Sequence, residues 1–165
     1  MAVDIGAEAI DRTARFHQFL LDFVVIEGNK VSASSGIVNK VVVYIDGSIG
    51  VYPRAIKVGT FYKTNGDQFS CRDYEINKIV DAGYNEIDTN LDVEIDDYIG
   101  IMLPRDLALE FDAAGGTEYW YVQTSDINLS AEDCIHTAGA IVSIGGFITT
   151  MTLPAVTTNP ATGIH

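Results

Sequence analysis

Apolar and polar residues alternate with a period of two along much of this chain, the pattern of β-strands that bury one face. The clearest stretch is AIKVGTFYKTNGDQFSCRD, residues 55–73. Asn65-Gly66 divides it, and this dipeptide tolerates positive φ at both positions of a tight turn. The sequence therefore predicts a β-hairpin, with two alternating strands joined at Asn65-Gly66.

Alternation, or runs of β-branched and aromatic residues, predict further short strands along the chain. They cover residues 37–45, 74–80, 91–103, 107–111, 118–123 and 138–151. The apolar segment Phe16–Ile26 fits either a buried helix or a strand, and its β-branched end favours a strand. Gly145-Gly146, inside the last strand, indicates a bulge or close backbone packing. We expect the core to include Val58, Phe69, Val93, Ile95, Ile101 and Trp120.

About ten short strands with frequent turns, and no convincing long helix, predict an all-β fold: an antiparallel β-sandwich of the jelly-roll kind. We divide the chain into an N-terminal arm (1–15), a sandwich domain (16–152) and an extended C-terminal tail (153–165). Ile10 and Ala14, four residues apart, fit one helical turn in the arm. The arm also fits a loosely ordered terminus, or an extended segment that packs on a neighbouring subunit.

The chain has 165 residues and a formal net charge of −13, which limits its partners. Nucleic-acid binding requires a basic face, so we expect no nucleic acid, and anionic membranes are disfavoured. Acidity of this kind fits a basic partner or bound cations. We find no apolar run long enough to span a bilayer and no secretory signal at the N-terminus.

The residues that most often carry catalysis or bind metals show no recognisable motif. His17, His136 and His165 are scattered, and Cys71 and Cys134 form no metal-ligand pattern. Two free, partly buried thiols are favoured over a disulfide, because cytosolic synthesis without a secretory signal disfavours oxidation. We therefore expect no catalytic residues, no cofactor and no metal site.

Acidic residues cluster near the interruption at Asp96-Asp97. Asp92 and Glu94 could serve hydrolysis as paired carboxylates, but they occupy the polar phase of a strand, which favours a solvated face. Asp96 and Asp97 are candidates for calcium ligands because they could supply oxygen atoms. A plain turn is the preferred interpretation of these two residues.

Three consecutive aromatic residues, Tyr119, Trp120 and Tyr121, lie in one predicted strand. Neighbouring side chains in a strand point to opposite faces, so Tyr119 and Tyr121 share one side. They could form a sugar-stacking platform or contact another subunit. The alternative is that Trp120 and Val122 fill the core, with the two tyrosines at its rim or in an interface.

The segments KVGTFYKTNGDQFSCRD, LDVEIDDYIGI and GTEYWYV resemble a recurring jelly-roll or lectin-like β-sandwich domain in virion structural proteins of tailed bacteriophages and prophages. The resemblance extends roughly from Ile26 to Gly145. It implies a non-enzymatic viral structural protein that decorates or builds a phage capsid or tail surface, in a virion assembled in the host cytoplasm.

The partners implied are other copies of the chain, which we expect to form a trimer, and a major capsid or tail protein. The alternative function is a carbohydrate-binding, lectin-like module for host-surface recognition. Its ligand would be a glycan.

Overall fold

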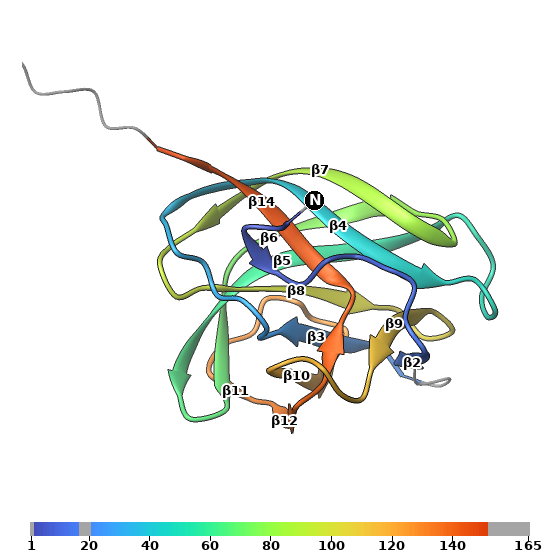
Figure 1. Ribbon diagram of the computed structural model, residues 1–165. Coiled ribbons are helices and arrows are strands. Elements are labelled where there is room, and N and C mark those ends of the chain that lie inside the picture. Colours follow the sequence, from blue (N-terminus) through green and yellow to red (C-terminus); the bar gives the residue numbers. More distant parts are fainter. Residues whose placement is uncertain (1, 17–20, 152–165) are drawn as a thin grey trace, which may run out of the picture.

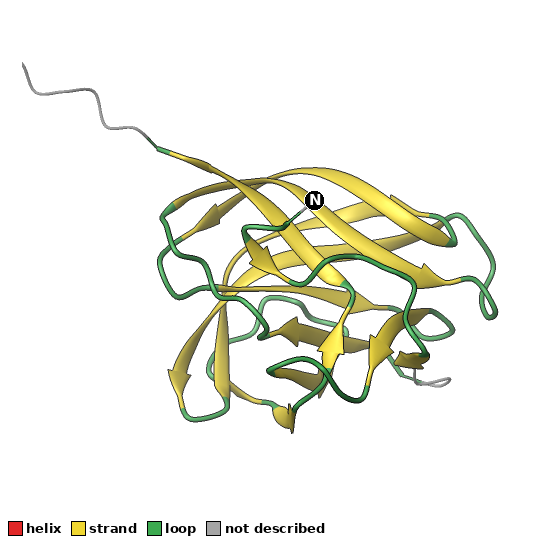
Figure 2. Ribbon diagram, in the orientation of Figure 1, coloured by secondary structure: helices red, strands yellow, loops and turns green. Residues whose placement is uncertain are grey.

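The computed structural model describes residues 2–16 and 21–151, and within these ranges every regular element is a β-strand (Figure 2). The strands are β1 (Ile5–Gly6), β2 (Ala14–Phe16), β3 (Phe23–Glu27), β4 (Gly36–Asp46), β5 (Arg54–Asn65), β6 (Gln68–Val80), β7 (Gly83–Val93), β8 (Tyr98–Leu103), β9 (Ala108–Asp112), β10 (Glu118–Gln123), β11 (Glu132–Asp133), β12 (Ile135–Ala138), β13 (Ile141–Val142) and β14 (Ile144–Thr150).

The strands form two seven-stranded antiparallel sheets, which confirms the prediction of an antiparallel β-sandwich (Figure 1). Sheet A has the order β1-β14-β4-β9-β13, with β7 paired to β4 and β2 paired to β9. Sheet B has the order β11-β6-β5-β8-β3-β10-β12. The strands beyond the ten expected are short pieces such as β1, β11 and β13, which alternation over two residues cannot reveal. The C-terminal tail predicted at 153–165 lies outside the described residues.

The main core lies between the two sheets. Val58, Val93 and Ile101 are buried there, as predicted. Ile95, also predicted for the core, is 59% exposed. That prediction is wrong because β7 ends at Val93, and the chain turns at Ile95-Asp96 before β8 begins.

A second apolar cluster covers part of the outer face of sheet B. Trp120 and Phe69 are fully buried in it, beneath Ile127 and Leu129 of the segment that follows β10. This segment, which lies between the strands predicted at 118–123 and 138–151, contains the short strands β11 and β12. All five residues of β3 are buried, because the strand lies between β8 and β10 and both of its faces are covered. Burial on both faces accounts for the continuous apolar run Phe23–Ile26 in this strand.

The part of the N-terminal arm that precedes β2, residues 2–13, packs on sheet A of its own chain. Its β1 pairs with β14, Ile5 opposite Gly146 and Gly6 opposite Gly145 (Figure 1). The helical turn predicted from Ile10 and Ala14 is absent from the described residues 2–16, so this prediction is wrong. Alternate arm residues are buried instead: Val3, Ile5, Ala7 and Ala9.

The far end of the arm is fixed by Arg12. Its Nε donates to Ser143 Oγ at 2.7 Å, and its guanidinium is paired with Asp112 at 3.3 Å. The backbone N–H of Arg12 donates to the carboxylate of Glu110 at 3.1 Å. The arm is therefore held at both ends, by strand pairing at β14 and by Arg12 near β9.

The predicted hairpin is confirmed as β5 and β6, with one change in its turn. Asn65 and Gln68 form the last cross-strand pair, so the two loop residues are Gly66 and Asp67, and only Gly66 has positive φ, at 50°. Alternation holds along β5: Val58 and Thr60 point inward, and Phe61 points into the second cluster. The register with β6 shifts between Thr60 and Phe61 and skips Arg72, so the bulge lies in β6.

The edges of the two sheets meet where β6 lies next to β7. The carboxylate of Asp73 accepts the backbone N–H of Asp92 at 2.9 Å, and that of Glu75 accepts the N–H of Asn90 at 2.7 Å. Lys78 Nζ donates to the backbone carbonyl of Asp88 at 2.9 Å. Side chains of β6 thereby satisfy backbone groups of β7 that a neighbouring strand would otherwise pair.

Candidate functional site

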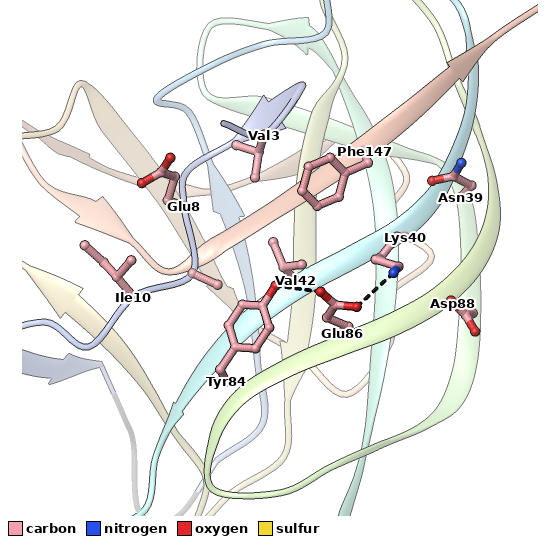
Figure 3. Close-up of a pocket in the computed structure, with 11 residues that line it drawn as sticks. Val3, Glu8, Ile10, Asn39, Lys40, Val42, Tyr84, Glu86, Asp88 and Phe147 are labelled. Carbon is pink, nitrogen blue, oxygen red and sulfur yellow. Dashed lines mark hydrogen bonds and ion pairs between the residues drawn. The ribbon is translucent and has the colours of Figure 1, made fainter. Parts of the chain in front are cut away.

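A groove of about 550 Å³ opens on the outer face of sheet A, between the N-terminal arm and β7 (Figure 3). Glu8 and Ile10 of the arm lie on one side of it, and Tyr84 and Asp88 of β7 lie on the other. Val42 of β4 lies between them on the floor. The volume is in the range of sites that hold a small ligand or a few side chains of a partner.

The polar side of the groove is a chain of three side chains on neighbouring strands. Lys40 Nζ is paired with Glu86 Oε2 at 2.8 Å, and the Tyr84 hydroxyl donates to Glu86 Oε1 at 3.0 Å. Both carboxylate oxygens of Glu86 are therefore engaged. The hydrogen bond to Lys40 lowers the pKa of Glu86, and the same bond raises the pKa of Lys40. The charge of Lys40 is compensated within the groove.

The β4–β7 register explains this arrangement. Lys40 pairs with Asp88, Val42 with Glu86 and Tyr44 with Tyr84. Paired residues point to the same face of a sheet, so Lys40 and Val42 line the groove together with the three β7 residues. Lys40 lies opposite Asp88 in the strand pairing, but its side chain extends diagonally to Glu86.

The apolar part of the groove comes from the arm and from β14. Val3, Ala9 and Val42 form a small buried cluster, against which Phe147 and Tyr44 pack. Tyr84 is 52% exposed, so part of its ring faces the opening. The arm is thus both a cover for sheet A and one wall of the site.

Two carboxylates in the groove take part in no hydrogen bond or ion pair with the described residues. They are those of Glu8 on the arm and Asp88 on β7. Only the backbone carbonyls of these two residues accept hydrogen bonds, from Arg12 and Lys78. With Glu86 set against Lys40, the groove keeps an excess of negative charge.

The aromatic residues singled out from the sequence lie elsewhere. Tyr119 is 5% exposed and packs in the main core, its ring centroid 6.2 Å from that of Phe111. Tyr121 packs partly buried against the same core, and Trp120 is fully buried on the other face, as the core interpretation predicted. A ring as buried as Tyr119 has no free face for a sugar, so a stacking platform at Tyr119 and Tyr121 does not form.

The calcium candidates lie in the turn between β7 and β8, where the preferred interpretation placed a plain turn. Asp96 adopts a positive φ of 69°, while the buried carboxylate of Asp97 is held by Arg72 through Nε and through an η-nitrogen at 2.9 Å. The backbone N–H of Glu94 donates to the same carboxylate at 2.8 Å. Arginine occupies the position that a cation bound to Asp97 would need.

The remaining candidates from the sequence are the cysteines, the histidines and the acidic residues of β7 and the turn after it. The two cysteines belong to the second cluster. Cys71 and Cys134 are free thiols, and burial raises the pKa of each to about 12. His136 stacks on Trp120 with ring centroids 5.2 Å apart and contacts Glu118 at 2.8 Å. His17 and His165 lie outside the described residues. Asp92 and Glu94 are exposed, as the solvated-face interpretation predicted.

Within residues 2–16 and 21–151, no three His, Cys, Asp or Glu side chains gather closely enough to hold a metal ion. The described chain also has no helix of the length and hydropathy that crossing a membrane requires.

Sequence reasoning did not identify the groove, although one signal for it exists. Tyr84, Glu86 and Asp88 repeat with a period of two around the buried Ile87. The sequence does not show that β7 pairs with β4 or that the arm lies alongside. No protein-family model matches the sequence, and neither the curated proteins nor the solved structures contain a match.

Proposed function

We propose that this chain is a non-enzymatic structural protein of a phage-like particle, which self-associates while it builds or decorates a capsid or tail surface. The observation that carries the proposal is an apolar stripe on β6. Tyr74, Ile76 and Ile79 are 41%, 52% and 61% exposed. Large side chains exposed side by side are typical of surfaces that contact another protein.

The three side chains share the outer face of sheet B. Ile56 and Val58 of β5 point into the main core, so their neighbours Ala55 and Gly59 face outward. Ala55 pairs with Ile79 and Gly59 pairs with Tyr74, which places both partners on the outer face. Ile76, next to the inward-facing Glu75, lies between them. The stripe is continuous along β6.

Charge supports a second copy of the chain as the occupant of this stripe. At a net charge of −13, identical copies repel one another over most of their surface. On the outer face of β5 and β6 beside the stripe, the charged side chain is Lys57, and its Nζ already donates to the carbonyl of Ser125 at 2.9 Å. The carboxylates of Asp73 and Glu75 are turned inward to β7. The three side chains of the stripe themselves add no negative charge to a contact between copies.

Light scattering after gel filtration tests self-association, with the mass compared with 17.9 kDa for one chain. We expect a discrete oligomer, a trimer, that the pair of changes Ile76→Asp and Ile79→Asp converts to monomer. Ile95→Asp is the matched control, because Ile95 is equally exposed but lies on the β7–β8 turn, and it should leave the oligomer intact. A wild-type chain that stays monomeric at high concentration contradicts the proposal.

Association with a particle needs its own test. Genes for a capsid or tail protein are expected beside this one, and the product of that neighbouring gene is the partner to co-express. We expect the chain to co-sediment with the assembled particle and the stripe variant to be reduced in the pellet. A chain that remains in the supernatant with every such particle contradicts the structural role.

A further inference from the structure

We infer that the groove on sheet A receives a basic segment of a partner protein, which places lysine or arginine side chains against the carboxylates of Glu8 and Asp88. The groove is on the sheet opposite the β6 stripe, so this inference goes beyond the proposed self-association and does not depend on it. Two features of the groove define the ligand, its charge and its apolar floor.

The charge of the groove selects a cation. Three carboxylates line it, those of Glu8, Glu86 and Asp88, against the single ammonium of Lys40. Lys40 is held by Glu86 at 2.8 Å, and Tyr84 occupies the other oxygen of Glu86, so this set is complete without a ligand. Glu8 lies on the arm side of the groove and Asp88 on the β7 side, and neither carboxylate has a hydrogen bond or ion pair among the described residues (Figure 3).

The floor of the groove selects a cation on an apolar stem. Val42, Ala9 and Phe147 supply the surface on which methylene groups of a long side chain can pack. The half-exposed ring of Tyr84 stands at the β7 wall, where it can contact a cation through its face. A small inorganic cation would gain nothing from these apolar and aromatic contacts.

The charge of the whole chain and the size of the groove favour a protein partner. A net charge of −13 attracts a basic surface over a long range and speeds its association. A volume of about 550 Å³ holds more than one extended side chain, so a short stretch of polypeptide fits it better than a single amine. The inference is therefore a basic peptide segment, and a free polyamine is the alternative source of the same chemistry.

Titration calorimetry on the full chain at low salt tests this, with an acetylated and amidated ten-residue peptide of alternating arginine and alanine as probe. The test variant carries Glu8→Gln and Asp88→Asn. The control variant carries Asp81→Asn and Glu132→Gln, two exposed acids outside the groove. Each variant removes two negative charges, so a general electrostatic attraction falls equally in both.

We expect the groove variant to bind the peptide about tenfold more weakly than wild type, since each lost ion pair contributes up to about 1 kcal/mol and 1.4 kcal/mol is a factor of ten. The control variant should lose less than about a third of that free energy. Tyr84→Leu should weaken binding again, through loss of the aromatic face. All these residues are exposed or at the surface, and thermal unfolding of each variant confirms that the fold is kept.

Three results would overturn the inference. Equal losses in the groove and control variants mean attraction by net charge alone. Binding of spermidine but not of the peptide means a polyamine site, and binding of a neutral oligosaccharide but not of the peptide means a glycan site. Absence of peptide binding by the wild-type chain at low salt removes the inference directly.

Discussion

The backbone N–H of Val142 on β13 donates a hydrogen bond of 2.7 Å to Oε2 of Glu27 on β3. This bond crosses the sandwich from sheet A to sheet B. The other oxygen, Oε1, accepts the backbone N–H of Asn29 at 2.6 Å. Glu27 is fully buried, and its burial raises its pKa to about 7, although these hydrogen bonds and the charge of Arg12 oppose the rise.

Glu27 makes stability depend on pH in the neutral range. The folded chain keeps a proton on Glu27 up to about pH 7, whereas the unfolded chain releases it near the ordinary glutamate pKa of 4.5. Its stabilising contribution is therefore complete below pH 4.5 and is lost as the pH rises through 7, by at most about 3 kcal/mol. Urea unfolding at pH 5 and pH 8 measures this, and Glu27→Gln should flatten the dependence. Parallel curves for variant and wild type would contradict it.

Arg72 and Asp97 form the ion pair on which the β7–β8 turn depends. Asp97 is buried, so Arg72→Leu leaves an unpaired carboxylate in the protein interior and should cost about 3–5 kcal/mol. The exposed pair Lys40–Glu86 is the control, and Lys40→Leu should cost under about 1 kcal/mol. Chemical denaturation gives both values. Equal effects of the two changes would mean that Asp97 is solvated.

Gly145 permits the arm to lie against β14. A Cβ atom at this position would be 2.3 Å from the carbonyl oxygen of Ala7 and 2.8 Å from Val3 Cγ1. Gly145→Ala should therefore displace the arm and cost about 1–3 kcal/mol, with faster hydrogen exchange at the amides of Gly6 and Ala7. Thr150→Ala, exposed on the same strand, should leave both amides protected. Unchanged exchange in the glycine variant would show that the arm is held by other contacts.

The two cysteines should be unreactive in the folded protein. With the pKa of each thiol raised to about 12, about one in ten thousand is ionised at pH 8, and the thiolate is the reactive form. DTNB should modify the native chain slowly and both thiols quickly after unfolding in guanidinium chloride. Fast modification of the native chain at either cysteine would contradict the burial that the structure gives them.

The sequence predicted the elements better than their faces. The β5–β6 hairpin was predicted because its period of two and its Asn-Gly turn are local signals, and Trp120 was correctly placed in a core. Ile95 was wrongly assigned to the core because the alternation of Leu91, Val93 and Ile95 continues past the end of β7 into the turn. The bulge at Arg72 could not be predicted either, because one extra residue on β6 leaves no sign in the alternating pattern.

The groove could not be predicted, because it is made by long-range pairing. Lys40 and Glu86 meet only when β4 pairs with β7, and Glu8 joins them only when the arm lies along sheet A. The buried alternation of Val3, Ile5, Ala7 and Ala9 was a usable sign that the arm forms extended structure. The sequence does not show which sheet the arm covers, because that depends on the long-range pairing of β1 with β14.

The pairing of β1 with β14 sets the order in which the chain can mature on the ribosome. Ile5 leaves the exit tunnel early and cannot find its partner Gly146 until nearly all of the described chain has been synthesised. Until that moment the early arm exposes its apolar side chains, and the binding wall that it forms does not exist. Nascent or truncated chains would therefore lack the complete groove that the proposed basic segment requires until translation has passed β14.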